Sequence, residues 1–136
     1  MKLQPDRFDM QSITAYGPGW VGVDGEKITA SVVLGSRGQR LAWHCERFAD
    51  LTPAHFAQLA ELECELVLFG SGLRNRFPPP AWLQALMARR IGLETMDTHA
   101  ACRTYNILAG EGRSVVAALL LESPGNGAGC ERGVSG

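Results

Sequence analysis

The chain has 136 residues, of which 46% are hydrophobic and 20% are charged. This length suits one domain with a single sizeable core, because a second domain would have too little apolar surface to bury. The formal net charge is -1, and the chain contains 11 Arg but only two Lys. Nucleic-acid binders normally carry a basic domain with clustered cations and stacking aromatics, so the composition argues against that class.

The charge is unevenly distributed along the chain. Residues 1–70 carry six basic and nine acidic side chains, whereas residues 71–113 carry six basic and three acidic ones. A mildly basic region of this kind can attract a small anion or an acidic partner surface. No stretch is long enough to span a membrane, and the amino terminus resembles neither a signal peptide nor a transit segment. We therefore expect a cytoplasmic protein without a membrane span.

The cysteines and histidines show no metal-ligand spacing. Cys occurs at positions 45, 64, 102 and 130 and His at positions 44, 55 and 99, with no pair separated by two residues as in zinc or redox motifs. His44 and Cys45 are adjacent and would point to opposite faces of a strand. We therefore expect no metal and no cofactor, and we expect Cys64 and Cys102 to be buried with reduced thiols.

Short apolar segments separated by Gly turns predict an antiparallel β unit in the first third of the chain. Residues 1–11 are polar and are expected to form a flexible arm. Gly17-Pro18-Gly19 and Asp24-Gly25 supply turn residues between strands. The expected strands cover residues 13–16, 20–23, 27–34 and 40–44. In the third of these, Val33 breaks the alternation of apolar and polar side chains.

Helices and strands then alternate, which predicts parallel strand pairing with helical crossovers. The expected helices cover residues 52–62, 81–90 and 99–109, and the expected strands cover residues 66–69, 91–95 and 115–121. Helical spacing predicts three buried faces, formed by Phe56, Leu59 and Ala60, by Leu83, Leu86 and Met87, and by Ala101, Tyr105 and Leu108. Residues 12–122 would thus form a single α/β domain, followed by a disordered Gly-rich tail at residues 123–136.

Two polar loops follow central strands of this predicted sheet. Gly70-Ser71-Gly72 ends one strand and Met96-Asp97-Thr98 ends the next. In open α/β sheets, ligands bind at the carboxyl ends of the strands, and Arg74 and Arg76 could balance an anion there. The pattern lacks the lysine of a P-loop and the third glycine of a dinucleotide fingerprint. A tight turn with solvated arginines explains the same residues.

The helix at residues 99–109 carries a polar stripe. His99, Arg103, Asn106 and Gly110 recur at helical spacing. One interpretation is structural, with Arg103 paired to Asp97 or Glu111; the other makes Asp97 a general base or Arg103 an anion clamp. No nucleophile or second acid stands beside them, so no catalytic residue is assigned. The candidate ligand-binding residues are Gly70, Ser71, Gly72, Arg74, Asp97, Thr98, Arg103 and Asn106.

Six segments resemble, in order, a family of small domains of unknown function. They are ITAYGPG (13–19), VLFGSG (67–72), RFPPP (76–80), ETMDT (94–98), ACRTYNIL (101–108) and EGRSVVAAL (111–119). The resemblance implies a three-layer α/β fold whose central mixed sheet has five strands, one antiparallel to the rest. The family usually has Gly-Thr-Gly where this chain has Gly70-Ser71-Gly72, so a hydroxyl is kept. No reaction is established for the family, so the resemblance implies no catalytic residue.

Three functional hypotheses follow. Eukaryotic members of the family include the mitochondrial NADH:ubiquinone oxidoreductase assembly factor of the third type, so the resemblance implies an unidentified protein partner. That hypothesis makes the chain a non-enzymatic binding or assembly protein acting through residues 71–80 and the polar stripe. The alternative is a small-molecule or anion-binding protein, or an enzyme, with its pocket at the strand ends. A homodimer formed through apolar edge strands is the third hypothesis.

Overall fold

The fold contains two sheets and three α-helices within residues 10–122, which are the residues that the computed structural model describes. Residues 1–9 of the expected arm (1–11) and the expected tail at residues 123–136 lie outside this range. The elements are β1 (Ile13–Gly17), β2 (Trp20–Val23), β3 (Glu26–Ile28), β4 (Val32–Gly35), β5 (Arg40–Ala42), η1 (Phe48–Asp50), α2 (Pro53–Ala60), β6 (Leu66–Gly70), η2 (Pro80–Leu83), α3 (Gln84–Ala88), β7 (Gly92–Met96), α4 (Thr98–Gly110) and β8 (Val115–Leu119).

The larger sheet has five strands in the order β5-β4-β8-β6-β7. Strand β6 pairs in parallel with both β7 and β8, whereas β4 is antiparallel to both of its neighbours. One strand therefore runs against the other four, as the family resemblance implied. The parallel pairing expected for the strands near residues 66 and 91 is confirmed, and Gly70 lies opposite both Met96 and Leu119.

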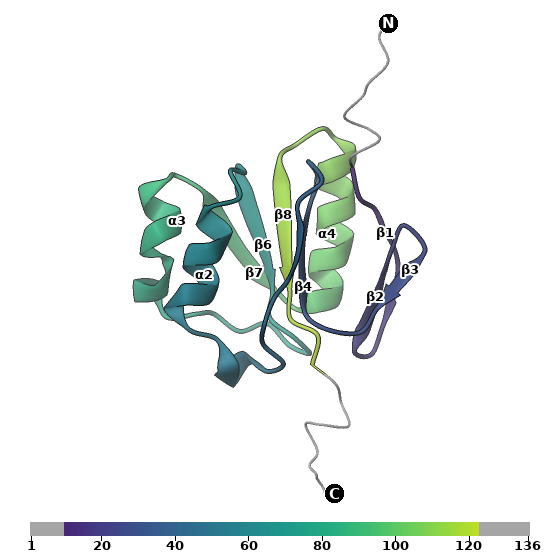
Figure 1. The fold of residues 1–136 in the computed structure, drawn as a ribbon, viewed down its shortest axis with the longest axis horizontal. Helices are drawn as coiled ribbons and strands as arrows, with labels where there is room; N and C mark the ends of the chain where they lie inside the picture. The colour runs from purple at the N-terminus through teal and green to yellow at the C-terminus, as the bar shows by residue number, and fades with distance from the viewer. Residues whose placement is uncertain (1–9, 123–136) are drawn as a thin grey trace, which may run out of the picture.

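The larger sheet is the middle layer of three. Helices α2 and α3 cover one face, and α4 covers the other together with the small antiparallel sheet β1-β2-β3 (Figure 1). Alternation along β6 explains the two cores, because Val67 and Phe69 pack toward α2 while Leu68 packs toward α4. All three side chains are fully buried. This arrangement confirms the predicted α/β class and its central mixed sheet.

An aromatic cluster fills the core beneath α2. Trp43 is 1% exposed, and its ring meets those of Phe56 and Phe69 edge to face, with centroid distances of 6.0 and 5.8 Å. Such pairs contribute about 0.5–1.5 kcal/mol each beyond the area that they bury. Phe56, Leu59 and Ala60 are all buried, so the predicted inner face of α2 is confirmed.

The strand expected at residues 27–34 was wrong, because the chain forms two strands in two sheets there. Strand β3 closes the small sheet and β4 enters the larger one, with residues 29–31 crossing between them. The crossing explains the broken alternation at Val33, because it carries the chain into the larger sheet. Strand β4 is covered on both faces, so Val33 packs in the α2 core while Val32 and Leu34 pack in the α4 core.

The helix expected at residues 81–90 is shorter than predicted, because its first turn is the 3-10 helix η2. A 3-10 turn has three residues per turn rather than 3.6, so it shifts which side chains face the core. Leu86 is buried as predicted, but Met87 is 67% exposed. None of the helices within the described range is long and apolar enough to cross a bilayer.

Gln11 belongs to the folded domain rather than to the expected arm. Its side chain is 8% exposed, and its amide nitrogen donates to the backbone oxygens of Gly35 (3.0 Å) and Gln39 (2.7 Å). Its backbone oxygen accepts a hydrogen bond from the Tyr105 hydroxyl at 2.7 Å. The chain is therefore attached to the core two residues before β1 begins.

Candidate functional site

The two polar loops predicted to form a site do meet at one end of the larger sheet. The Ser71 amide donates to the Met96 oxygen at 2.8 Å, and the Thr98 amide donates to the Gly72 oxygen at 2.9 Å. These bonds continue the β6–β7 ladder beyond the strands. The structure thus brings Gly70, Ser71 and Gly72 together with Asp97 and Thr98 at the N-terminus of α4.

The Thr98 hydroxyl joins three segments of the chain at this junction. Thr98 is 4% exposed, and its hydroxyl donates to the Leu120 oxygen at 2.7 Å. The same oxygen accepts a hydrogen bond from the Gly72 amide at 2.9 Å. The hydroxyl therefore connects the loop after β6, the start of α4 and the end of β8. Both of its hydrogen-bonding roles are used within the protein.

The Ser71 hydroxyl closes the loop that follows β6. Ser71 is fully buried, and its hydroxyl oxygen accepts from the Arg76 amide at 2.8 Å. Its hydrogen can reach the Arg74 oxygen at 2.8 Å, which is nearer than the alternative Met96 oxygen at 3.2 Å. A hydroxyl in this position fixes the backbone of residues 71–76. This local role accounts for a hydroxyl residue at the middle of the Gly-Ser-Gly motif.

A partly buried ion pair holds the same loop against the end of β8. The Arg76 guanidinium lies 2.6 Å from the Glu122 carboxylate, and the two side chains are 25% and 14% exposed. The carboxylate also accepts from the amides of Phe48 and Leu73, each at 3.2 Å. Arg76, considered as an anion ligand, is thus neutralised within the protein. Sequence reasoning missed Glu122, which is 46 residues away in the sequence.

The two glycines of the motif make room for protein rather than for a ligand. A Cβ on Gly70 would lie 3.0 Å from the Thr98 Cα and 3.2 Å from the Ala101 Cβ, so Gly70 allows α4 to pack closely on β6. Gly72 has φ +105°, a backbone conformation that favours glycine. A Cβ there would collide with the Glu122 carboxylate and would lie 2.6 Å from the Arg76 guanidinium.

Asp97 caps α4 and does not pair with Arg103. One Asp97 oxygen accepts from the Ala100 amide at 2.9 Å, the contact expected of an N-cap. The Arg103 guanidinium instead donates to the Tyr16 hydroxyl at 3.1 Å, and this hydrogen bond raises the pKa of Arg103. Neither ion pair of the structural interpretation, Arg103 with Asp97 or with Glu111, is present within residues 10–122.

The polar stripe of α4 holds the outer edge of β1. The Asn106 side chain accepts from the Ile13 amide at 2.9 Å and donates to the Ile13 oxygen at 2.7 Å, as a neighbouring strand would. His99 makes a hydrogen bond of 3.1 Å with the Gly17 oxygen. These side chains satisfy backbone groups of an edge strand, so the stripe joins α4 to the N-terminal hairpin.

A pocket of about 160 Å³ lies beside the junction. Its lining residues are Gly17, Gly19, Gly72, Leu73, Asp97, Thr98, His99, Leu120, Leu121 and Glu122. The volume is below the roughly 300–1,000 Å³ that is usual for small-molecule sites. Asp97 and Glu122 line the pocket, and Arg76 offsets the charge of Glu122. Neither Arg74 nor Arg103 lines it, so these two arginines, which were also considered as anion ligands, do not reach this pocket.

The cysteines of the described range are buried and protonated. Burial raises the pKa of Cys45 and Cys102 to about 12 and also raises the pKa of Cys64. A protonated thiol is a poor nucleophile and a poor metal ligand. Burial of Cys64 and Cys102 was predicted and is confirmed. No group of three or more side chains within residues 10–122 is arranged to hold a metal ion.

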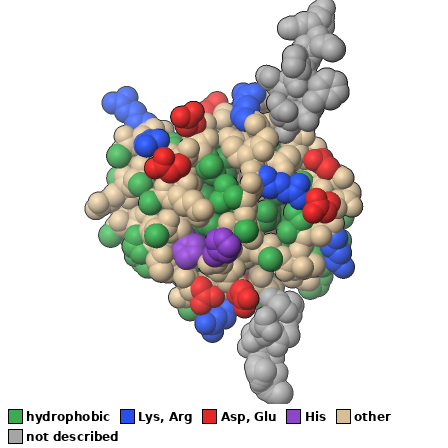
Figure 2. All heavy atoms as spheres, viewed as in Figure 1, with side chains coloured by type: hydrophobic (Ala, Val, Ile, Leu, Met, Phe, Trp, Pro, Cys, Tyr) green, Lys and Arg blue, Asp and Glu red, His purple; other side chains and the backbone are tan. Residues whose placement is uncertain are grey.

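The loop after the Gly-Ser-Gly motif exposes apolar side chains. Leu73 is 59% exposed and Phe77 is 72% exposed. Between them, Arg74 is exposed, and its side chain makes no hydrogen bond or ion pair with a described residue. On the face shown in Figure 2, basic and acidic side chains lie in small mixed groups. Two of the four large apolar side chains that are exposed in the described range therefore lie on this loop, which follows the predicted site.

These features define a three-layer α/β domain in which the polar groups at the strand-end junction form hydrogen bonds with other groups of the same chain. The chain belongs to the family described as protein of unknown function (DUF498/DUF598), whose model matches residues 13–120. Membership confirms the resemblance noted in the sequence.

The curated relatives are named NADH dehydrogenase (ubiquinone) 1 alpha subcomplex assembly factor 3. The Bos taurus protein is 38% identical over 85 residues, which are 61% of this chain and 46% of the relative. The Homo sapiens protein is 30% identical over 125 residues, which are 90% of this chain and 67% of the relative. The chain thus spans about half the length of the bovine relative that it matches.

Solved structures of bacterial proteins share the fold. A Bordetella parapertussis protein is 38% identical with a TM-score of 0.78, over 83% of this chain and 97% of that one. A Bordetella pertussis protein described as an Mth938-like domain is 33% identical with a TM-score of 0.75, over 90% of this chain and 94% of that one. A Xanthomonas campestris protein is 30% identical with a TM-score of 0.74, over 91% and 93%.

Proposed function

We propose that this protein is a non-enzymatic assembly factor that binds a protein partner through residues 73–77, here called the docking loop. The observation that carries the proposal is the exposure of Leu73 and Phe77 on a loop whose base is fixed. Curated relatives are named as assembly factors of the NADH dehydrogenase alpha subcomplex, which supports a partner from that complex.

The docking loop has the chemistry of an interface centre. Aromatic and Arg side chains dominate the energetics of protein interfaces, and here Phe77 and Arg74 are both exposed. Burying an exposed Leu or Phe side chain contributes roughly 1.5–3 kcal/mol. The Ser71 hydroxyl and the Arg76–Glu122 ion pair hold the ends of the loop, which reduces the entropy lost when a partner binds.

The polar groups that suggested chemistry have structural roles instead. Asp97 caps α4, Thr98 joins three segments, and Arg103 contacts Tyr16. The partner surface that we first expected also included the polar stripe, and the Asn106 side chain of that stripe hydrogen-bonds both backbone groups of Ile13. The docking loop is the part of that surface where large apolar side chains are exposed. The anion-binding alternative has no comparable support, since no Lys or Arg lines the adjoining pocket.

The test is copurification with NADH dehydrogenase. The tagged chain is produced in its own cells, and NADH dehydrogenase and its partly assembled subcomplexes are identified in the captured material. The docking variant is Leu73→Ala with Phe77→Ala. The control variant is Met87→Ala with Ile107→Ala, which removes two side chains that are 67% and 61% exposed on other elements.

We expect the wild type and the control to capture equal amounts of the complex. The docking variant should capture at least about tenfold less, which corresponds to a loss of about 1.4 kcal/mol in binding free energy. All three should melt at similar temperatures, because each substitution removes exposed atoms. Equal capture by the docking variant would refute the role of the loop. Failure of the wild type to capture any NADH dehydrogenase species would refute the assembly role.

A further inference from the structure

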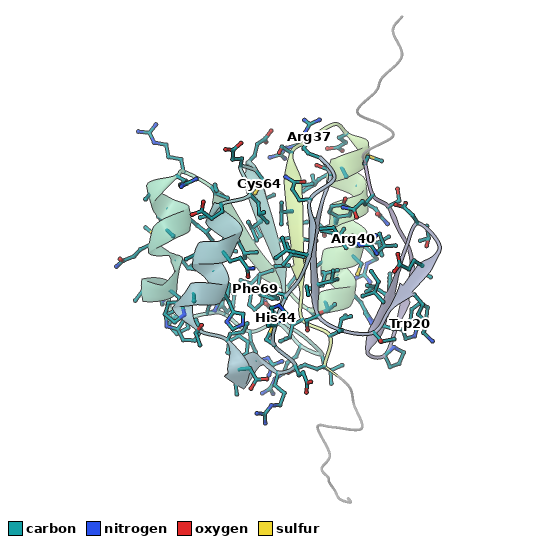
Figure 3. The ribbon with its side chains drawn as sticks, in the orientation of Figure 1. Trp20, Arg37, Arg40, His44, Cys64 and Phe69 are labelled. Atoms are coloured by element: carbon teal, nitrogen blue, oxygen red, sulfur yellow. The ribbon has the colours of Figure 1, made fainter. Side chains whose placement is uncertain are left out.

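The two sheets leave four strand edges, and three of them are short or covered. The outer edge of β1 is held by Asn106 of α4. Strands β3 and β5 have three residues each, and Arg40 of β5 (labelled in Figure 3) forms an ion pair of 2.8 Å with Glu26 of β3. The fourth edge belongs to β7, which has five residues and pairs only with β6 among the described elements.

The hydrogen-bond phase of β7 identifies which backbone groups point away from β6. The Gly92 amide donates to the Glu65 oxygen at 3.0 Å, and the Met96 oxygen accepts from the Ser71 amide at 2.8 Å. In a parallel ladder, alternate residues direct both backbone groups to the same neighbour. Gly92 and Met96 therefore face β6, as does Glu94 between them. Leu93 and Thr95 direct their N–H and C=O groups to the open edge.

This edge is accessible and incompletely satisfied. Every residue of β7 is exposed or half-buried, whereas all of β8 is buried. The outward backbone groups of Leu93 and Thr95 have no neighbouring strand to pair with within the described range. Sheet edges of this kind accept an added strand, whose main-chain hydrogen bonds supply affinity.

We propose that the edge of β7 binds an extended segment of the partner protein as an added strand, with a Lys or Arg of that segment beside Glu94. Glu94 is exposed and has no ion pair among residues 10–122, so it favours a basic neighbour. The proposal rests on the proposed function, because it describes how the same partner is held. The Ser71–Met96 hydrogen bond joins the end of β7 to the loop segment that leads into the docking loop.

Charge also argues against a second copy of this chain as the occupant. Two β7 strands related by a twofold axis would pair antiparallel. The register that uses all the outward backbone groups pairs Leu93 with Thr95 and places Glu94 opposite its own copy. Like charges directly opposite one another destabilise a strand pair. The edge therefore suits a basic segment of another protein better than it suits a homodimer.

The experiment uses two variants of Thr95 and the NADH dehydrogenase captured as described above. Thr95→Pro removes one outward N–H, which has no partner within the described chain, and proline is tolerated on an edge strand in that orientation. Thr95→Val keeps the N–H and removes only the hydroxyl. Amide hydrogen exchange of Leu93, Glu94 and Thr95 is measured in the free wild-type chain and in its complex.

In the free chain, we expect the Leu93 and Thr95 amides to exchange rapidly and the Glu94 amide to be protected by β6. In the complex, both outward amides should slow by at least about tenfold. Thr95→Pro should weaken capture by at least about tenfold, and Thr95→Val should match the wild type. Binding that leaves both outward amides unprotected would overturn the added strand while sparing the docking loop. Absence of any wild-type complex would overturn both proposals.

Discussion

Replacing Thr98 by Val tests whether the strand-end junction is structural. Valine has nearly the shape of threonine but lacks the hydroxyl, which donates to the Leu120 oxygen at 2.7 Å and accepts from the Gly72 amide at 2.9 Å. The substitution leaves a buried N–H and a buried C=O without partners. Each such group costs about 1–3 kcal/mol, so we expect the free energy of unfolding to fall by about 2–5 kcal/mol.

Urea denaturation and calorimetry measure this loss, and Thr98→Ser is the matched control. Serine keeps the hydroxyl and removes one methyl group, which should cost about 1 kcal/mol. For a domain of this size, a loss of about 3 kcal/mol corresponds to a melting temperature lower by roughly 10 °C. A Thr98→Val protein that is as stable as the wild type, or more stable than Thr98→Ser, would refute the structural role of the hydroxyl and favour a ligand-binding one.

Three further predictions concern packing, an edge contact and buried thiols elsewhere in the domain. Gly70→Ala should lower the free energy of unfolding by about 1–3 kcal/mol in urea denaturation, because its Cβ would lie 3.0 Å from the Thr98 Cα. Gly110→Ala, where the added atom meets nothing within 4 Å beyond its own turn of helix, should not lower the free energy of unfolding, and equal losses for the two variants would contradict the packing argument. Asn106→Ala should cost about 1–2 kcal/mol and speed amide exchange at Ile13, and an unchanged Ile13 amide would contradict the edge contact. In a Cys130→Ser background, the raised pKa values predict thiols that stay unreactive toward a disulfide reagent at pH 8 until unfolding, and rapid labelling of the folded protein would contradict this for Cys45, Cys64 and Cys102.

The sequence predicted the elements well wherever local pattern determines them. The apolar run of β6 and the helical spacing on α2 and α4 depend only on neighbouring residues, and the structure agrees there. The prediction was wrong where a side chain's surroundings come from distant segments. Val33 was treated as an irregularity in one strand, although burial on both faces of β4 explains it. The error at Met87 has a local cause, because an α-helical period was continued through the adjoining 3-10 turn η2.

At the candidate site, too, the local features were predicted from the sequence and the contacts with distant segments were not. The two polar loops were correctly predicted to meet, because both follow parallel strands and the carboxyl ends of parallel strands lie at one edge of a sheet. Partners for the polar groups could not be found from spacing. Arg103 contacts Tyr16, which is 87 residues away, and Asn106 contacts Ile13, which is 93 residues away. The place of the N-terminal hairpin beside α4 determines both contacts, and that place is a tertiary feature.

The most direct test of the account is a binding curve for the purified chain on immobilised NADH dehydrogenase or its assembly subcomplex. We expect saturable binding, with the dissociation constant raised at least about tenfold by Leu73→Ala with Phe77→Ala. Met87→Ala with Ile107→Ala should leave the dissociation constant unchanged, although it removes side chains of similar exposure. Equal dissociation constants for the docking variant and the control would contradict the central claim that the docking loop holds the partner.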